Sequence, residues 1–173
     1  YLSFKTLIVA TINGVPITRF EVIKLLERQG GEQALDNLIT RRLILQEAKN
    51  KGLSMSQPEI DEKLSKLNTY LEGQGTNLDS ALEFQKQTKE ELIADITVQG
   101  LVEKILQEDL SVSDEEINSY FKQNRDFFAE DATLADSSQQ IREQLKNDKL
   151  TAKFQEWLDT ARSEASIRRF LNY

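Results

Sequence analysis

The sequence contains no histidine and no cysteine, and these two absences exclude much of the familiar chemistry of protein active sites. Without these residues the chain can form neither a Ser-His-Asp nor a Cys-His catalytic site. It also lacks the thiolate and imidazole ligands of zinc and haem sites, and it has no histidine to change charge between pH 5 and 8. An enzyme with this sequence would depend on carboxylates, lysine, tyrosine or serine.

Two patterns contain the right residue types for chemistry, but structural roles explain both. Ser119 and Lys122 have S-x-x-K spacing, yet they lie in an amphipathic helical stretch, and neither S-D-N nor K-T-G accompanies them. The carboxylates at 114–116 are of the type that binds hard cations, but acidic residues in a first helical turn also interact favourably with the helix dipole. We therefore predict no catalytic residue, no cofactor-binding residue and no metal ligand.

The composition is that of a polar, acidic and globular protein. The 173 residues are enough for one domain with a core, and 39% of them are apolar. Asp and Glu outnumber Lys and Arg by 29 to 22, and the formal charge of −7 repels nucleic acids and anionic membranes. We expect no nucleic-acid partner. The longest apolar run, Leu7–Ala10, is far below the ~20 residues of a membrane span, so we expect no membrane insertion by this chain.

Local signals place a small β-hairpin first and helices after it. Leu7–Ile12 is apolar and β-branched, Asn13 and Gly14 suit a type I′ turn, and 15–17 can return as a second strand. Pro16 cannot donate a ladder hydrogen bond, which confines its strand to a sheet edge. Capping boxes then indicate helix starts. The pairs are Thr18 with Glu21, Ser56 with Glu59, Thr88 with Glu91, Ser113 with Glu116, and Ser137 with Gln140.

Apolar spacing predicts which helices form the core. A further helix is expected to begin near Glu32 and to end before Gly52, and its small polar surface marks it as the central buried helix. The helix over 57–72 has one narrow apolar seam, so 57–87 is a candidate helical hairpin arm or lobe. Two more core helices are expected to follow. They cover 89–109 and 114–126.

The last third of the chain is predicted to contain a connection, a long helix and a strand. Periodicity breaks over 126–136, and we assign 129–138 as a connection. A long helix over 137–163 carries a core stripe, and 166–173 is interpreted as a strand that pairs with the N-terminal strand. The predicted fold class is mostly α, with a small antiparallel β-sheet formed by the N-terminal hairpin and the C-terminal strand.

Four segments carry a resemblance to a known family. They are VATINGVPITRFEV at Val9–Val22, LDNLITRRLILQEAKNKGLSMSQPEID at Leu35–Asp61, VSDEEINSYFKQNRDFF at Val112–Phe128, and IREQLKNDKLTAKFQEWLDTARSEASIRR at Ile141–Arg169. In order and type they resemble the chaperone domain of the SurA/PrsA-like extracytoplasmic foldases, which surrounds a parvulin-type prolyl isomerase domain. The resemblance implies a single helical chaperone domain over 1–173, located in the periplasm or at the cell surface. Because the sequence begins with Tyr1, we expect any signal or membrane anchor to lie upstream of it.

The departure from the family pattern is equally informative. Where the family inserts a parvulin domain of about 90 to 100 residues, this chain has only roughly ten, Ala129–Ser138. Parvulin active sites use paired histidines with a cysteine or an aspartate, and this sequence has neither histidine nor cysteine. We therefore expect no isomerase activity of the parvulin type.

The resemblance implies that the chain binds exposed apolar segments of unfolded polypeptides. Our candidates for client binding are Tyr70, Leu78, Phe84, Phe127 and Phe128, at the predicted arm tip and in the connection. An ordinary core role is the favoured alternative for Leu78 and Phe84, because apolar residues at helical spacing usually face inward. For Phe127 and Phe128 both interpretations stay open.

The predicted function is that of a non-catalytic holdase for unfolded or newly secreted polypeptides, acting outside the cytoplasm without a cofactor. The main alternative is a dimerisation or interaction scaffold left from a larger SurA/PrsA-like isomerase. A homodimer is compatible with either function. An enzyme of unrelated chemistry would need a concave pocket where carboxylates or lysine converge.

Overall fold

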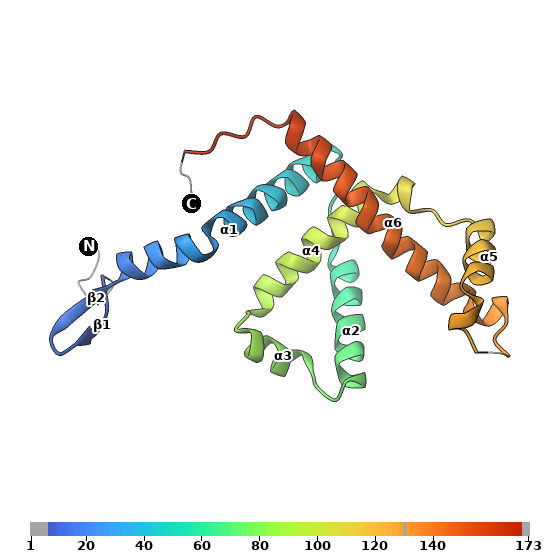
Figure 1. Ribbon diagram of the computed structural model, residues 1–173, viewed down its shortest axis with the longest axis horizontal. Helices are drawn as coiled ribbons and strands as arrows, with labels where there is room; N and C mark the ends of the chain where they lie inside the picture. The colour runs from blue at the N-terminus through green and yellow to red at the C-terminus, as the bar shows by residue number, and fades with distance from the viewer. Residues whose placement is uncertain (1–6, 130, 171–173) are drawn as a thin grey trace. The chain divides into compact units, whose positions relative to one another are not determined.

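A computed structural model describes residues 7–129 and 131–170 of the chain (Figure 1). The contacts divide the chain into two compact units, and each is described by itself. The terminal unit consists of residues 1–42 and 166–173, and the helical unit consists of residues 43–165. The single domain expected over 1–173 stays a prediction.

The terminal unit contains the predicted hairpin. Strands β1 (Ile8–Ile12) and β2 (Val15–Thr18) form a two-stranded antiparallel sheet. Asn13 and Gly14 have φ angles of 51° and 84°, the two positive values of the type I′ turn that the sequence predicts. The register places Ile12 opposite Val15, Thr11 opposite Pro16, and Ala10 opposite Ile17, with an irregularity between Ile8 and Ala10.

Helix α1 (Arg19–Asn50) contributes residues to both units. Its start is the predicted capping box, in which the Thr18 N–H donates to the Glu21 carboxylate at 2.8 Å. The separate helix expected to begin near Glu32 is wrong, because α1 is continuous through Gly30-Gly31. A glycine costs a helix roughly 1 kcal/mol but does not end it, since its N–H still completes the ladder. The helix ends as expected before Gly52, which has a φ of +66°.

The predicted C-terminal strand is wrong over residues 166–170, which are described but pair with no strand. Ile167 and Phe170 are three residues apart, so in a strand they would lie on opposite faces and provide no apolar side for a sheet. The segment is instead tied to α1 by Arg169, whose guanidinium lies 2.7 Å from the Asp36 carboxylate. Residues 171–173 of the predicted strand lie outside the described residues.

The helical unit contains most of the helices (Figure 1). They are α2 (Gln57–Gly73), α3 (Leu78–Gln85), α4 (Lys89–Ile105), α5 (Asp114–Gln123) and α6 (Leu134–Glu164), with 3-10 turns η2 (Gln107–Leu110) and η3 (Arg125–Phe127). Helix α2 packs against α4, and α5 packs against α6. The predicted caps at Ser56, Thr88 and Ser113 are confirmed. No helix in the described parts of the chain is long and apolar enough to span a membrane.

The start of α6 differs from the prediction. Thr133 caps the helix and accepts a hydrogen bond from the Asp136 N–H at 3.3 Å, so the connection is shorter than the predicted 129–138. Ser137 is not a cap but a buried residue within the helix, and its N–H donates to the Thr133 carbonyl. The helix begins one turn earlier than predicted, and there Thr133 satisfies the otherwise free Asp136 N–H of the first turn.

The core lies in the helical unit. Its main cluster combines residues of α1, α4, η2 and the Leu106 between them. The buried members are Ile44, Ala48, Leu101, Ile105, Leu106 and Leu110. Ile44 and Ala48 thus confirm a central role for the end of α1, whereas Leu38 and Leu45, expected in the same buried helix, are exposed. The mostly α fold with a small antiparallel sheet is confirmed.

Candidate functional site

Two of the predicted client-binding residues are strongly exposed where α2 is followed by α3. The Tyr70 side chain on α2 is 65% exposed, and that of Phe84 on α3 is 90% exposed. Leu78, at the first position of α3, is half-buried. The favoured core role is therefore wrong for Phe84, because α3 is only eight residues long and buries none of its residues fully.

Hydrogen bonds between residues close in sequence fix the start of α3 and join it to α2. The Asn77 side chain caps the helix by accepting from the Ser80 N–H at 2.9 Å. The Asn68 carboxamide on α2 accepts from the Leu78 N–H at 3.4 Å, which links the two helices. Lys86 then ends α3 in the left-handed conformation with a φ of 53°. These contacts fix the position of α3, and Phe84 on this helix is exposed to solvent.

Phe127 and Phe128 lie in a different place, after α5, and they have different roles. The Phe128 ring is half-buried and lies 5.0 Å from the Phe121 ring, centroid to centroid. The Arg125 guanidinium stands over the other ring of this pair, 5.3 Å from the Phe121 centroid. Phe127 is 87% exposed. One of the two neighbouring phenylalanines anchors the segment to α5, and the other is available for contact.

An open hollow of about 560 Å³ lies beside these phenylalanines. Its lining includes Tyr120, Asn124, Phe127, Phe128 and Gln140, from α5, the following segment and α6. The Asn124 carboxamide nitrogen donates to the Tyr120 carbonyl at 2.9 Å, which leaves its oxygen able to accept. Aromatic walls beside carboxamides suit one apolar side chain and the backbone polar groups next to it.

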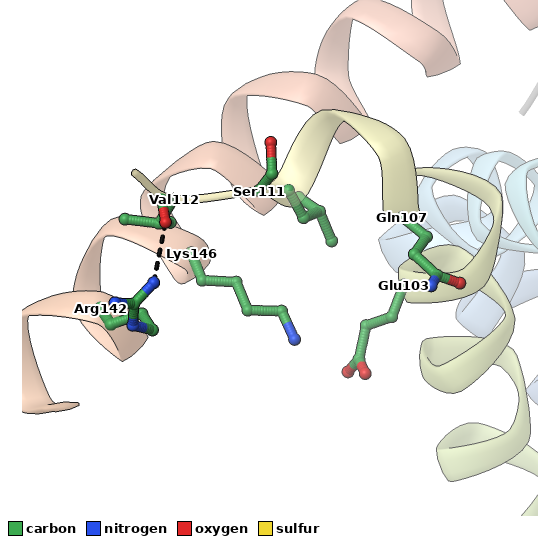
Figure 2. Close-up of a pocket in the computed structure, with 7 residues that line it drawn as sticks. Glu103, Gln107, Ser111, Val112, Arg142 and Lys146 are labelled. Atoms are coloured by element: carbon green, nitrogen blue, oxygen red, sulfur yellow. Dashed lines mark hydrogen bonds between the residues drawn. The ribbon is translucent and has the colours of Figure 1, made fainter. Parts of the chain in front are cut away.

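A second hollow, of about 230 Å³, lies between α6 and the end of α4, and Figure 2 shows Lys146 and Glu103 directed toward it from opposite sides. Two of its charged side chains, Arg142 and Glu103, form ion pairs. Arg142 donates to the Val112 carbonyl and to the Asp114 carboxylate, both at 2.8 Å, and the Glu103 carboxylate accepts from Lys63 at 2.8 Å. This hollow is thus a polar seam that joins α6 to its neighbours.

Two of the three acidic residues at 114–116 also have structural partners. Besides the Asp114–Arg142 pair, Glu116 lies 2.7 Å from Lys149 on α6. The hydrogen bond from Lys149 and the one from the Ser113 N–H lower the pKa of Glu116. These pairs fix α5 against α6. Within the described residues no group of three or more metal-ligating side chains is placed to hold an ion.

The structure therefore separates the predicted site residues into two groups. Tyr70, Leu78 and Phe84 belong to the α2–α3 segment, and Phe127 and Phe128 belong to the segment between α5 and α6. Each group presents one aromatic side chain that is almost fully exposed.

The sequence reasoning missed a larger apolar surface on the terminal unit, none of whose described residues is buried. Its exposed large apolar residues are Leu7, Val9, Ile12, Val15, Phe20, Val22, Ile23, Leu25, Leu26, Leu38, Ile167 and Phe170. A signal for it was present in α1. Leu26 and Leu35 are nine residues apart, which is two and a half helical turns, so the apolar groups around them face opposite sides and cannot share one core.

Charge divides the two units as well. Residues 1–42 and 166–173 contain eight Lys or Arg and four Asp or Glu, a formal charge of +4. Residues 43–165 contain fourteen Lys or Arg and twenty-five Asp or Glu, a formal charge of −11. The overall charge of −7 therefore conceals a basic unit and a strongly acidic one.

Known proteins resemble the chain over most of its length. Residues 20–106 match the SurA-like N-terminal domain family. The foldase protein PrsA of Halalkalibacterium halodurans is 31% identical over 129 residues, 70% of this chain and 38% of that protein. YacD of Bacillus subtilis, which carries the provisional name of a peptidyl-prolyl cis-trans isomerase, is 28% identical over 124 residues, 69% of this chain and 38% of YacD. PrsA of Caldanaerobacter subterraneus is 28% identical over 100 residues, 56% of this chain and 27% of that protein.

No solved structure matches the chain closely enough to add to these relationships. The chain spans less than half the length of the curated relatives it matches. The family match begins in the first turn of α1 and extends through α4 to Leu106, so it includes half of the chain and much of its core. The chain belongs to the SurA/PrsA-like family, through the SurA-like N-terminal domain.

Proposed function

We propose that the chain is a non-catalytic holdase that binds unfolded or newly secreted polypeptides outside the cytoplasm. The observation that carries the proposal is the exposure of Phe84 and Phe127, at 90% and 87%, on the unit that contains the buried core. Aromatic side chains are enriched at protein–protein contacts, where they supply much of the buried apolar area. Membership of a family with foldase members supports a polypeptide as that partner.

The energetics suit transient binding. A phenylalanine contributes about 1.5–3 kcal/mol when its side chain leaves water, and part of this gain is lost to ordering the client. Two separate aromatic contacts therefore hold a client weakly, so that it can leave and fold. The acidic surroundings, with a charge of −11 over residues 43–165, keep the chaperone soluble while its aromatic side chains are exposed.

We further propose that this chain does not itself catalyse prolyl isomerisation. Its sequence has no histidine or cysteine for a parvulin-type site, and only five residues separate Phe128 from the start of α6. The isomerase name belongs to a relative of which the chain matches 38%. The location of this chain outside the cytoplasm is implied by the family resemblance and is part of the proposal.

A dimerisation or interaction scaffold is the second candidate. The observation that favours it is the terminal unit, which has no buried residue among those described and exposes apolar side chains that a second copy would cover. A native mass that rises with protein concentration in the micromolar range would support this function.

The test is the suppression of aggregation of chemically denatured citrate synthase by the chain and by a Phe84→Ser, Phe127→Ser double variant. A Phe84→Leu, Phe127→Leu variant is the matched control, since it keeps apolar side chains at both positions. Substitutions at such exposed sites change folding stability by only about 0.5 kcal/mol or less, and circular dichroism checks this.

We expect the parent and the leucine variant to suppress aggregation and the serine variant to lose most of this effect. Equal suppression by all three proteins would overturn the assignment of Phe84 and Phe127 but keep the holdase. If the parent does not suppress aggregation at a tenfold molar excess, the holdase is wrong and the scaffold becomes the better account.

A further inference from the structure

The two outer edges of the terminal hairpin differ in their ability to pair with another strand. Opposite residues in an antiparallel ladder alternate between hydrogen-bonded and non-hydrogen-bonded pairs. Ile12 and Val15 flank the two-residue turn and form a hydrogen-bonded pair, so Thr11 and Pro16 form the next, non-hydrogen-bonded pair. The N–H and C=O of Thr11 therefore point away from β2. On the other edge, Pro16 has no N–H to offer.

The open edge is also uncharged and apolar. Residues 7–18 contain no charged side chain, and Leu7, Val9, Ile12 and Val15 are each more than half exposed. Proteins usually protect an edge strand with lysine, proline or a covering segment. In this hairpin β2 has its proline, whereas β1 has neither lysine nor proline, and no described segment pairs with its outer edge. The irregularity between Ile8 and Ala10 leaves residues 10–12 in regular pairing. A two-stranded hairpin is only marginally stable alone, so a third strand on β1 would stabilise it.

Charge and contacts in the terminal unit indicate which kind of strand fits. Residues 166–170 belong to the same unit, but the Arg169–Asp36 ion pair ties them to α1 and they form no strand. A β1 edge from a second copy would bring two units of charge +4 together, which is unfavourable. An extended polypeptide with apolar and acidic side chains meets neither obstacle.

We propose that the free edge of β1 binds an extended client segment as a third strand, and that it prefers segments with apolar and acidic rather than basic side chains. The proposal rests on the holdase function and specifies a binding mode and a client class for it. Backbone pairing to an open edge is largely independent of sequence, which suits a chaperone with varied clients, and the basic unit adds the charge preference.

The test uses the full chain and four synthetic peptides of about nine residues, the length of a long strand. In the first, Val and Phe alternate with Glu. The second and third peptides have the same side chains but carry N-methyl groups on alternate backbone amides. In the second peptide these groups lie on one edge of the extended strand, and in the third they lie on the other edge. Whichever edge of the peptide faces β1, one of these two peptides cannot pair with it. A Lys-for-Glu version of the first peptide tests the charge preference. Binding is measured by fluorescence anisotropy, and exchange of the Thr11 amide hydrogen is measured by NMR.

We expect the Glu peptide to bind, to slow exchange of the Thr11 amide roughly tenfold or more, and to bind more tightly than the Lys peptide at low salt. At least one N-methylated isomer should bind roughly tenfold more weakly. Thr11→Pro removes the outward N–H and should weaken binding to a similar extent. Thr11→Val keeps this N–H and is the matched control. If Thr11→Pro disturbs the hairpin, the exchange of the Thr11 amide in the parent decides.

Several outcomes would overturn strand addition at β1. These are equal binding of all Glu peptides, an unchanged Thr11 amide in the presence of saturating peptide, and a Thr11 amide that becomes protected with protein concentration alone, which would indicate a second copy. In each case continued suppression of citrate synthase aggregation would leave the holdase intact. If the parent chain does not suppress this aggregation either, the holdase function itself is refuted.

Discussion

The terminal and helical units contain similar kinds of residues but use them differently. Every fully buried side chain among the described residues belongs to the helical unit, where α1, α4, η2 and α6 supply the core. The terminal unit has a well-formed turn, a hairpin and a capped helix start, yet it buries none of its described residues. Local signals are thus sufficient to form secondary structure but not to form a core. The apolar residues that remain exposed are available for partners.

The charges follow the same division. The helical unit has its core closed and a charge of −11, which favours solubility, while the terminal unit has its apolar residues exposed and a charge of +4. We infer that the first unit supplies most of the folding stability and that the second supplies a surface for binding. The single tryptophan, Trp157, packs against the core of the helical unit and can report on that unit alone.

The largest expected difference is between core and surface truncations. Ile141 is 1% exposed on α6, so Ile141→Ala should lower the free energy of unfolding by about 2–5 kcal/mol. Leu26→Ala in the terminal unit removes a side chain that is 59% exposed and should change it by about 0.5 kcal/mol or less. Urea unfolding followed by Trp157 fluorescence measures both values. A loss of about 2 kcal/mol or more for Leu26→Ala in the Trp157 transition would contradict the separation of the two units, because it would show that Leu26 stabilises the same cooperative unit as Trp157.

A smaller difference is expected between two matched helix caps. Thr88 caps α4 and Thr18 caps α1, and in each case the side chain accepts from the third helical N–H at 3.2 Å. Thr88→Ala should lower the stability of the helical unit by about 1 kcal/mol, since its helix carries core residues. Thr18→Ala should leave the Trp157 transition unchanged and should lower helicity measured by circular dichroism. Equal shifts of the Trp157 transition in the two variants would mean that the units unfold as one.

The smallest expected difference concerns acid stability. The hydrogen bond from Lys104, followed by that from the Ser56 N–H, lowers the pKa of Glu59 from 4.5 to about 2. Since the pKa is depressed in the folded protein, the resulting stabilisation is present above pH 4.5 and is lost as the pH falls towards 2. In the parent, the urea midpoint of the Trp157 transition should fall as the pH is lowered from 4.5 towards 2. In Glu59→Gln this fall should be smaller.

Glu21 in the terminal unit provides the comparison for this acid dependence. Its pKa is lowered chiefly by the hydrogen bond from the Thr18 backbone. Because Glu21 lies in the unit without buried residues, Glu21→Gln should leave the acid dependence of the Trp157 transition as it is in the parent. An equal change in both variants would contradict the separation of the two units.

The sequence predicts the local structure well because capping boxes and turn residues act over three or four positions. Thr18, Ser56, Thr88 and Ser113 cap helices as predicted, and Asn13-Gly14 forms the turn. The prediction failed at Ser137 because two similar caps compete within one turn, and only tertiary burial of Ser137 decides between them.

The candidate site was harder to predict because burial depends on contacts across the chain. Helical spacing placed Phe84 in a core, yet the short α3 leaves its side chain exposed. The exposed residues of the terminal unit were overlooked for the opposite reason, since an apolar strand and helix are usually signs of a core. Neither outcome follows from periodicity, which shows the apolar side of a helix but not whether anything covers it.

The most direct test of the account is residue-resolved hydrogen exchange of the chain with and without a permanently unfolded client, reduced and carboxymethylated lactalbumin. Bound client should slow exchange around Phe84, around Phe127 and along β1, while exchange in the core helices α4 and α6 stays as in the free chain. The account would be contradicted if saturating client leaves exchange at all three surfaces unchanged.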